Sequence, residues 1–211
     1  MPRISRVTLA LLLVAPVTPL RAQVLHDHDF GGMLGVVFSK ATGSDAVGSK
    51  VATGIAVGGF LTLGFTRGLA LEPQALMVEK GLKTEEQGVT STLKLTYIQV
   101  PVLVKLRIPI GSNPDNSGYA FVGPALAGRV GCRLSLKQAD VSTNAGCEEA
   151  ADQIKTLDTS VIFGLGADLG RATFSVRYDM GLSSIDSSTD PGDVKNSAIL
   201  LLAGVRTRLN P

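Results

Sequence analysis

The sequence predicts an all-β chain folded as an eight-stranded, antiparallel, up-and-down β-barrel that crosses a membrane. Three observations lead to this fold. After residue 30, apolar and polar residues alternate with a period of two, as they do in strands with two different faces. Most alternating segments run for about ten residues or more, which suits a tilted membrane strand better than the shorter strands of soluble sheets. Tight turns alternate with longer polar connections, as at the two ends of an outer membrane barrel.

The composition describes a folded chain without a nucleic-acid partner. Of the 211 residues, 45% are hydrophobic and 18% are charged, which excludes a disordered, charge-rich chain. The formal net charge is +2, but three arginines and no acid lie in the first 22 residues. Removing those three arginines leaves 17 Lys and Arg against 18 Asp and Glu, so no basic surplus remains for binding nucleic acid.

The first 22 residues are expected to be a cleaved signal peptide. Arg3 and Arg6 precede an uncharged apolar run at 7–20, and Leu20 and Ala22 stand at positions −3 and −1 of a cut after Ala22. The alternative is an uncleaved membrane anchor, but a spanning helix needs about 20 apolar residues. The expected organisation is a signal peptide at 1–22, an N-terminal extension at 23–30 and a barrel domain at 31–211.

The first four predicted strands cover residues 31–40, 51–65, 68–80 and 91–109. Residues 41–50 form a polar loop, Thr66-Arg67 is a tight turn, and residues 81–90 are polar again. In the fourth strand, the apolar residues change from one face, with Tyr97, to the other face, with Ile98. Pro101 lacks the hydrogen-bond donor of a sheet ladder, so we expect a β-bulge near Ile98–Pro101.

The last four predicted strands cover residues 118–134, 157–169, 172–181 and 197–209. A polar turn at 110–117 precedes them, and Gly170-Arg171 is a tight turn. In the strand at 172–181, Phe174 and Val176 alternate with Ser175 and Arg177. With the N-terminus in the periplasm, tight turns face the periplasm, and the long loops face the exterior: 41–50, 81–90, 135–156 and 182–196.

If the apolar face of each strand meets lipid, its polar face fills the lumen. Eight strands enclose a space just wide enough for side chains, and charges buried there must be paired. We expect a salt-bridge network that closes the barrel, with a small anion-selective path as the alternative. The residues of this predicted network are Glu72, Lys105, Arg107, Arg129, Arg133, Asp168, Arg177, Asp179, Arg206 and Arg208.

No catalytic, cofactor or metal site is predicted. The run His26-Asp27-His28-Asp29 has metal-binding side chains, but it follows the cleavage site and is expected to be a solvated extension. No Ser/His/Asp triad or G-x-S-x-G elbow can be placed, so we expect no enzyme. Cys132 and Cys147 are expected to form a disulfide in an oxidising compartment, with two separate thiols as the alternative.

Several segments carry a resemblance to a known family. Leu95–Lys105 (LTYIQVPVLVK), Tyr119–Gly128 (YAFVGPALAG), Gly164–Leu182 (GLGADLGRATFSVRYDMGL) and the strand at Gly68–Gly81 resemble, in the same order, strands of the PorT-like outer membrane β-barrel domain family. The resemblance covers residues 30–209. It implies an antiparallel barrel in the bacterial outer membrane, without catalytic residues.

The expected function is that of an outer membrane barrel with a structural or interaction role, long loops exposed outward and a charged, salt-bridged lumen. Two alternatives remain: a narrow pore for small solutes, and a soluble periplasmic barrel that binds a ligand. The expected partners are outer membrane lipid and an extracellular or envelope protein. We expect a monomer that needs no cofactor.

Overall fold

The computed structural model describes residues 28–43, 50–86, 89–138, 141–146, 156–184 and 195–209. Nine strands lie in these ranges: β1 (His28–Thr42), β2 (Ala52–Gly64), β3 (Leu69–Glu86), β4 (Val89–Pro109), β5 (Ser117–Gln138), β6 (Val141–Gly146), β7 (Leu157–Leu169), β8 (Ala172–Ser184) and β9 (Lys195–Leu209). Within the same ranges, no helix is long and apolar enough to cross a membrane. The predicted signal peptide lies outside the described residues.

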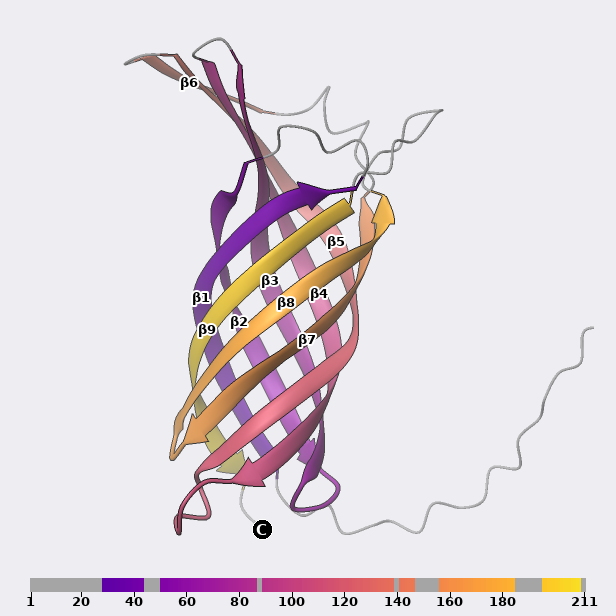
Figure 1. The fold of residues 1–211 in the computed structure, drawn as a ribbon, viewed down its shortest axis with the longest axis vertical. Helices are drawn as coiled ribbons and strands as arrows, with labels where there is room; N and C mark the ends of the chain where they lie inside the picture. The colour runs from indigo at the N-terminus through magenta and orange to yellow at the C-terminus, as the bar shows by residue number, and fades with distance from the viewer. Residues whose placement is uncertain are drawn as a thin grey trace, which may run out of the picture.

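Eight of the nine strands form a closed antiparallel barrel (Figure 1). Each strand from β1 to β4 pairs with the next one, β5 pairs with β7, and β7, β8 and β9 continue the sheet. The pairing of β9 with β1 closes the wall, so the barrel has no free edge. The predicted eight-stranded barrel is therefore confirmed. The remaining strand, β6, is not part of the wall and pairs with the end of β5 beyond it.

The two ends of the barrel differ (Figure 1). At one end, called the turn end here, short turns join β2 to β3, β4 to β5 and β7 to β8. Gly170 takes a φ of 60° in the β7–β8 turn, a left-handed conformation that residues with a Cβ rarely adopt. The opposite end, called the loop end, carries the hairpins that extend beyond the barrel wall. In outer membrane barrels the short turns face the periplasm.

Parts of two predicted loops are strands, which corrects the expectation. Residues 81–86 belong to β3 and pair with β4, whose first residue, Val89, lies opposite Glu86. Within the predicted loop 135–156, β5 continues to Gln138 and pairs with β6. The sequences of these segments are mostly polar although they form strands, so polarity here does not signal a loop. Most of 41–50 and 182–196 lies outside the described residues.

Lys50, which lies just before β2, contacts the β3–β4 hairpin through its backbone and its side chain. The Lys50 amide donates to the Lys83 carbonyl at 2.8 Å, and Nζ of Lys50 forms a hydrogen-bonded ion pair with Glu85. This hydrogen bond and the Lys50 charge hold the pKa of the Glu85 carboxyl below its usual value. Both side chains are exposed, so the pair positions the hairpin more than it stabilises the fold.

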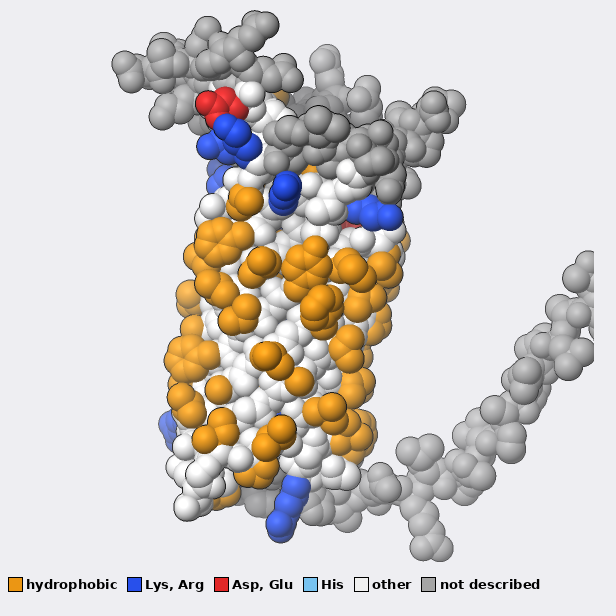
Figure 2. Space-filling model, in the orientation of Figure 1, with side chains coloured by type: hydrophobic (Ala, Val, Ile, Leu, Met, Phe, Trp, Pro, Cys, Tyr) orange, Lys and Arg blue, Asp and Glu red, His pale blue; other side chains and the backbone are white. Residues whose placement is uncertain are grey.

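Side chains alternate between the outer surface and the lumen as predicted. In β8, the outward Phe174 and Val176 are 48% and 55% exposed, whereas the inward Arg177 is 2% exposed. Figure 2 shows hydrophobic side chains over the barrel wall, with Lys and Arg side chains near its two ends. An apolar outer band of this kind faces hydrocarbon in a membrane barrel. In a soluble ligand-binding barrel, the apolar face would line the interior instead.

The irregularity in β4 was predicted at the wrong place. β4 keeps a regular alternation through Ile98 and Pro101. The register with β5 shifts where Thr96 pairs with Gly131 and Tyr97 with Arg129, so the extra residue is Val130 of β5. Tyr97 is an apolar residue that points into the lumen. The sequence pattern therefore suggests that the apolar face changes sides at this point, although the alternation of side chains in β4 continues without a break.

Candidate functional site

Five strands each contribute a charged side chain to a cluster in the lumen near the turn end. We call it the turn-side cluster; it consists of Asp29 (β1), Glu72 (β3), Lys105 (β4), Asp168 (β7) and Arg206 (β9), each at most 8% exposed. Nζ of Lys105 lies 3.0 Å from Oε2 of Glu72 and 3.5 Å from Oδ2 of Asp168. Nη1 of Arg206 lies 2.9 Å from Oδ2 of Asp29 and 3.9 Å from Oδ2 of Asp168. Asp168 thereby joins two ion pairs into one network.

Neutral groups support Glu72 and Lys105 of this cluster. The two carboxylate oxygens of Glu72 accept hydrogen bonds from Oγ1 of Thr62 at 2.7 Å and from Nε2 of Gln74 at 2.8 Å. Nζ of Lys105 lies 3.6 Å from the centre of the Tyr119 ring, which is a cation–π contact. Because buried charges are costly unless they are paired and hydrogen-bonded, these contacts make the cluster compatible with its burial.

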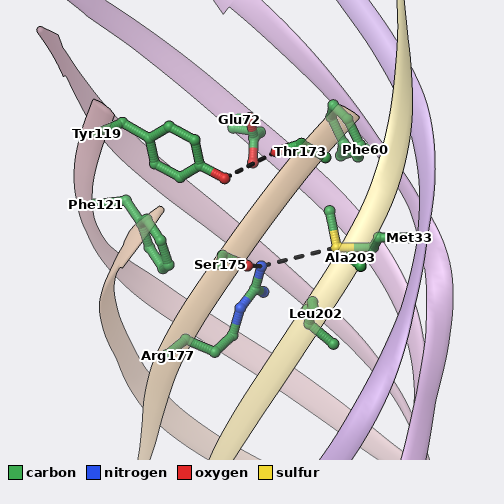
Figure 3. A pocket seen from close by; sticks show the side chains of 10 residues that line it. All are labelled: Met33, Phe60, Glu72, Tyr119, Phe121, Thr173, Ser175, Arg177, Leu202 and Ala203. Atoms are coloured by element: carbon green, nitrogen blue, oxygen red, sulfur yellow. Dashed lines mark hydrogen bonds between the residues drawn. The ribbon is translucent and has the colours of Figure 1, made fainter. Parts of the chain in front are cut away.

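Arg177 of β8 lies in the lumen next to this cluster (Figure 3). Its Nη1 donates to Oε1 of Gln74 at 2.8 Å, and its Nη2 contacts Oγ of Ser175 at 3.3 Å and Sδ of Met33 at 3.8 Å. The guanidinium lies 5.3 Å from the centre of the Phe121 ring. In the described part of the chain it forms no ion pair with a carboxylate, so dipoles and an aromatic ring compensate its charge.

The lumen is almost filled beside Arg177. The cavity there has a volume of about 10 Å³, which is room for a single water molecule at most. Figure 3 shows Phe60, Tyr119 and Phe121 around this space together with Arg177. A hydrated ion is larger than this cavity.

A second charged cluster, the loop-side cluster, lies farther toward the loop end and consists of Lys80 (β3), Gln99 (β4), Asp158 (β7) and Asp179 (β8). Nζ of Lys80 lies 2.8 Å from Oδ2 of Asp179 and 3.8 Å from Oδ2 of Asp158. Nε2 of Gln99 donates to Oδ2 of Asp179 at 2.8 Å. All four residues are at most 2% exposed. One cation here holds two carboxylates from neighbouring strands together.

Apolar side chains fill much of the remaining lumen beside the charged residues, which the expectation that the polar face fills the lumen did not include. They form three clusters of inward-facing residues, the largest of which contains Met33, Val37, Ala56, Phe60, Leu76, Val78, Ala198, Leu200 and Leu202. The narrow bore explains this packing: a lumen without bulk water buries apolar side chains as well as a soluble core does.

The predicted network residues separate into three groups. Six of them are buried in the lumen: Glu72, Lys105, Asp168, Arg177, Asp179 and Arg206. Arg107 and Arg129 are half-buried, whereas Arg133 and Arg208 are exposed. Arg133 lies in the part of β5 that extends past the barrel wall, and Arg208 lies at the turn end, 2.7 Å from a carboxylate oxygen of Asp115.

Three buried charged residues were missed by the sequence reasoning. Lys80 and Asp158 lie on the inward faces of β3 and β7, in phase with Glu72 and Asp168. Continuing the alternation by steps of two from these acids would have found both. Asp29 was assigned to a solvated extension, but it is buried in β1 and pairs with Arg206, which corrects that prediction.

The remaining candidate ligands do not form a site in the described residues. Within these ranges, no group of three His, Cys, Asp or Glu side chains is arranged to hold a metal ion. His28 belongs to β1, while His26 lies outside the described ranges. Cys132 packs beside Leu95 and Tyr97, and Cys147 also lies outside those ranges, so the disulfide stays a prediction.

The chain is similar to several solved outer membrane barrels. Ail of Yersinia pestis, solved with the heparin analogue sucrose octasulfate, is 17% identical; the match covers 86% of this chain and 100% of Ail, with a TM-score of 0.45. OprG of Pseudomonas aeruginosa is 14% identical over 86% of this chain and 95% of its own, with a TM-score of 0.46. Neisserial surface protein A is 14% identical over 84% and 96%, with a TM-score of 0.43.

A family assignment comes from the sequence itself. No curated protein matches the chain. Residues 21–187 match the family described as outer membrane protein beta-barrel domain, and this match includes β1 to β8. The described fold agrees with it, because the wall is closed, the outer face is apolar and the lumen is charged. The chain therefore belongs to the outer membrane protein beta-barrel domain family and is located in the bacterial outer membrane.

Proposed function

We propose that this outer membrane protein is a closed barrel whose role is structural and interactive, and that it does not conduct ions. The observation that carries the proposal is the filled lumen, with a cavity of only about 10 Å³ beside Arg177. The turn-side and loop-side clusters act as a plug in this proposal. Removing Lys80 would leave Asp158 and Asp179 buried without their cation, and removing Lys105 would do the same to Glu72, so the plug is not easily displaced.

The loop end is the surface that we assign to interactions. The β3–β4 hairpin and β5–β6 extend past the barrel wall there (Figure 1). Exposed or half-exposed cations of these extensions include Lys83 and Arg133. Their charge supports an acidic extracellular or envelope protein as the partner. We propose a monomer, since lipid alone is sufficient to cover the apolar outer band.

Two finer assignments are also proposals. The PorT-like motifs in β3, β4, β5 and the β7–β8 hairpin support membership of that subgroup. A non-catalytic role is supported by the ion pairs of the buried charged residues. These residues lie inside a lumen that substrates cannot enter: Glu72, Lys105, Asp168 and Asp179.

Conductance in planar lipid bilayers tests the closed barrel. The full chain should insert without producing discrete conductance steps, because the cavity beside Arg177 is smaller than a hydrated ion. Phe121→Ala combined with Arg177→Ala removes two side chains that border the cavity and should admit a small leak current. Arg133→Ala, at an exposed position outside the lumen, is the matched control and should remain silent.

Heat-modifiable gel migration in detergent checks that each of these variants is folded before its conductance is measured. Regular conductance steps from the folded wild-type chain would contradict the closed barrel and favour the narrow pore.

A further inference from the structure

The turn end holds a cavity of about 480 Å³ that is separate from the filled lumen. Its walls come from the β2–β3 turn, the end of β4, the β4–β5 turn at 110–116 and the end of β9. Four arginines line it, and no Asp or Glu does: Arg67, Arg107, Arg206 and Arg208. Its lining therefore favours an anion.

Two of the four arginines already have acid partners. Arg206 pairs with Asp29 at 2.9 Å, and Arg208 pairs with Asp115 at 2.7 Å. Arg67 and Arg107 form no ion pair with any carboxylate in the described part of the chain. Among the described residues, no carboxylate offsets the charges of these two guanidiniums by an ion pair.

Arg107 is also short of hydrogen-bond acceptors. Its Nε is buried without a partner among the described residues. Its Nη2 makes one long hydrogen bond to the Thr66 carbonyl, at 3.4 Å. The Nε itself is enclosed by protein atoms, so the Nη groups, which make this one long hydrogen bond among the described residues, are the donors that remain for a ligand oxygen.

The β4–β5 turn adds neutral donors to the same cavity. Oδ1 of Asn113 accepts the Asp115 amide at 2.9 Å, and Oδ1 of Asn116 accepts the Gly170 amide at 2.9 Å. With both oxygens occupied, the side-chain NH₂ groups of these two asparagines are the groups left to bind a ligand. Backbone hydrogen bonds between Ile110 and Asn116 and between Asn116 and Asn113, both 3.0 Å, hold the turn in shape.

We propose that this cavity is a binding site for a phosphate group. Two guanidiniums without acid partners among the described residues favour an oxyanion, and the planar forks of arginine suit phosphate oxygens. The amide groups would bind the remaining oxygens. Since the turn end faces the periplasm, the phosphate is either a free ion or part of a phospholipid headgroup of the inner leaflet.

Calorimetric titration of the folded full chain with inorganic phosphate tests the site, in a maltoside detergent that contains no phosphate. Saturable binding is expected, and it should weaken as sodium chloride is added. Arg67→Gln and Arg107→Gln should each lower the affinity by about tenfold, since each removes a charge-assisted hydrogen bond. Arg171→Gln is the matched control: Arg171 is an arginine of the β7–β8 turn at the same end but does not line this cavity.

The two sources of phosphate are separated by repeating the titration in vesicles. If the headgroup is the ligand, phosphatidylglycerol vesicles should block the binding of added phosphate, whereas vesicles of a phosphate-free glycolipid should permit it. If the free ion is the ligand, phosphate should bind in both. The proposal is overturned if the wild-type chain shows no saturable binding in detergent or glycolipid. Arg67 lies on an exposed turn, so Arg67→Gln is expected to fold. The proposal is also overturned if Arg171→Gln loses as much affinity for phosphate as Arg67→Gln does.

Discussion

Buried charges in this barrel form groups in which one cation contacts two carboxylates, rather than isolated pairs. Lys80 holds Asp179 at 2.8 Å and Asp158 at 3.8 Å, and all three are buried. The contrasting pair is Lys94 with Glu79, at 3.8 Å and partly exposed to solvent. Water screens the second pair but not the first, so the same ionic chemistry should have very different energetic consequences at the two places.

Lys80→Met tests this contrast. The substitution leaves two carboxylates buried without their cation, and it should lower the free energy of unfolding by about 3–5 kcal/mol. Lys94→Met removes the exposed partner of Glu79 and should cost less than about 1 kcal/mol. Urea unfolding of the two variants in lipid vesicles provides the measurement. Adding Asp179→Leu to Lys80→Met should recover part of the loss, and equal losses for both single variants would contradict the assignment.

Close approach of neighbouring strands constrains the wall at particular glycines. In β5, a Cβ placed on Gly123 would overlap the Val102 carbonyl oxygen of β4, whereas a Cβ on Gly128 would meet no atom within 4 Å. Neither glycine has a positive φ, so alanine suits the backbone conformation of both. The difference between them is therefore one of space between strands.

Gly123→Ala should accordingly destabilise the barrel by about 1–3 kcal/mol, because the β4–β5 pairing must shift to accommodate the methyl group. Gly128→Ala, in the same strand, should change stability by less than about 0.5 kcal/mol. Unfolding curves of the two variants in the same vesicles measure the difference. Similar stability of the two would mean that β4 and β5 are not as closely spaced at Gly123 as the structure has them.

The barrel has an apolar outer band on the face shown in Figure 2, and the β3–β4 hairpin extends past the wall at the loop end. Val176 and Leu201 point outward from β8 and β9 and are half-exposed on the outer surface. Lys83 lies in the β3–β4 hairpin beyond this band. Val176 and Leu201 are therefore expected to lie at the depth of the lipid tails, and Lys83 outside the hydrocarbon region.

Fluorescent labels report that depth. Bimane on Val176→Cys or Leu201→Cys should be quenched by brominated lipid tails and not by iodide in solution, whereas bimane on Lys83→Cys should show the reverse. Both native cysteines are replaced first, as Cys132→Ser and Cys147→Ser, so that each variant carries a single label. Quenching of Val176 or Leu201 labels by iodide would contradict a lipid-facing wall.

The sequence by itself determined the fold class and the outward face of strands whose alternation is unbroken, such as β8. A period of two is a local property, so Phe174, Val176 and Arg177 could be assigned to opposite faces without any knowledge of neighbouring strands. Alternation in steps of two would also have predicted Lys80 and Asp158 as inward residues. The hairpin extensions were harder to predict, because a strand outside the lipid has no apolar face to reveal it.

Only the tertiary structure decided which inward residues meet. Asp29 and Arg206 are 177 positions apart, yet closure of β9 on β1 brings them to 2.9 Å. The stagger between strands sets such contacts, and alternation along one strand contains no information about stagger. For the same reason, the four arginines of the turn-end cavity, which come from three separate segments, could be recognised as neighbours only in the folded barrel.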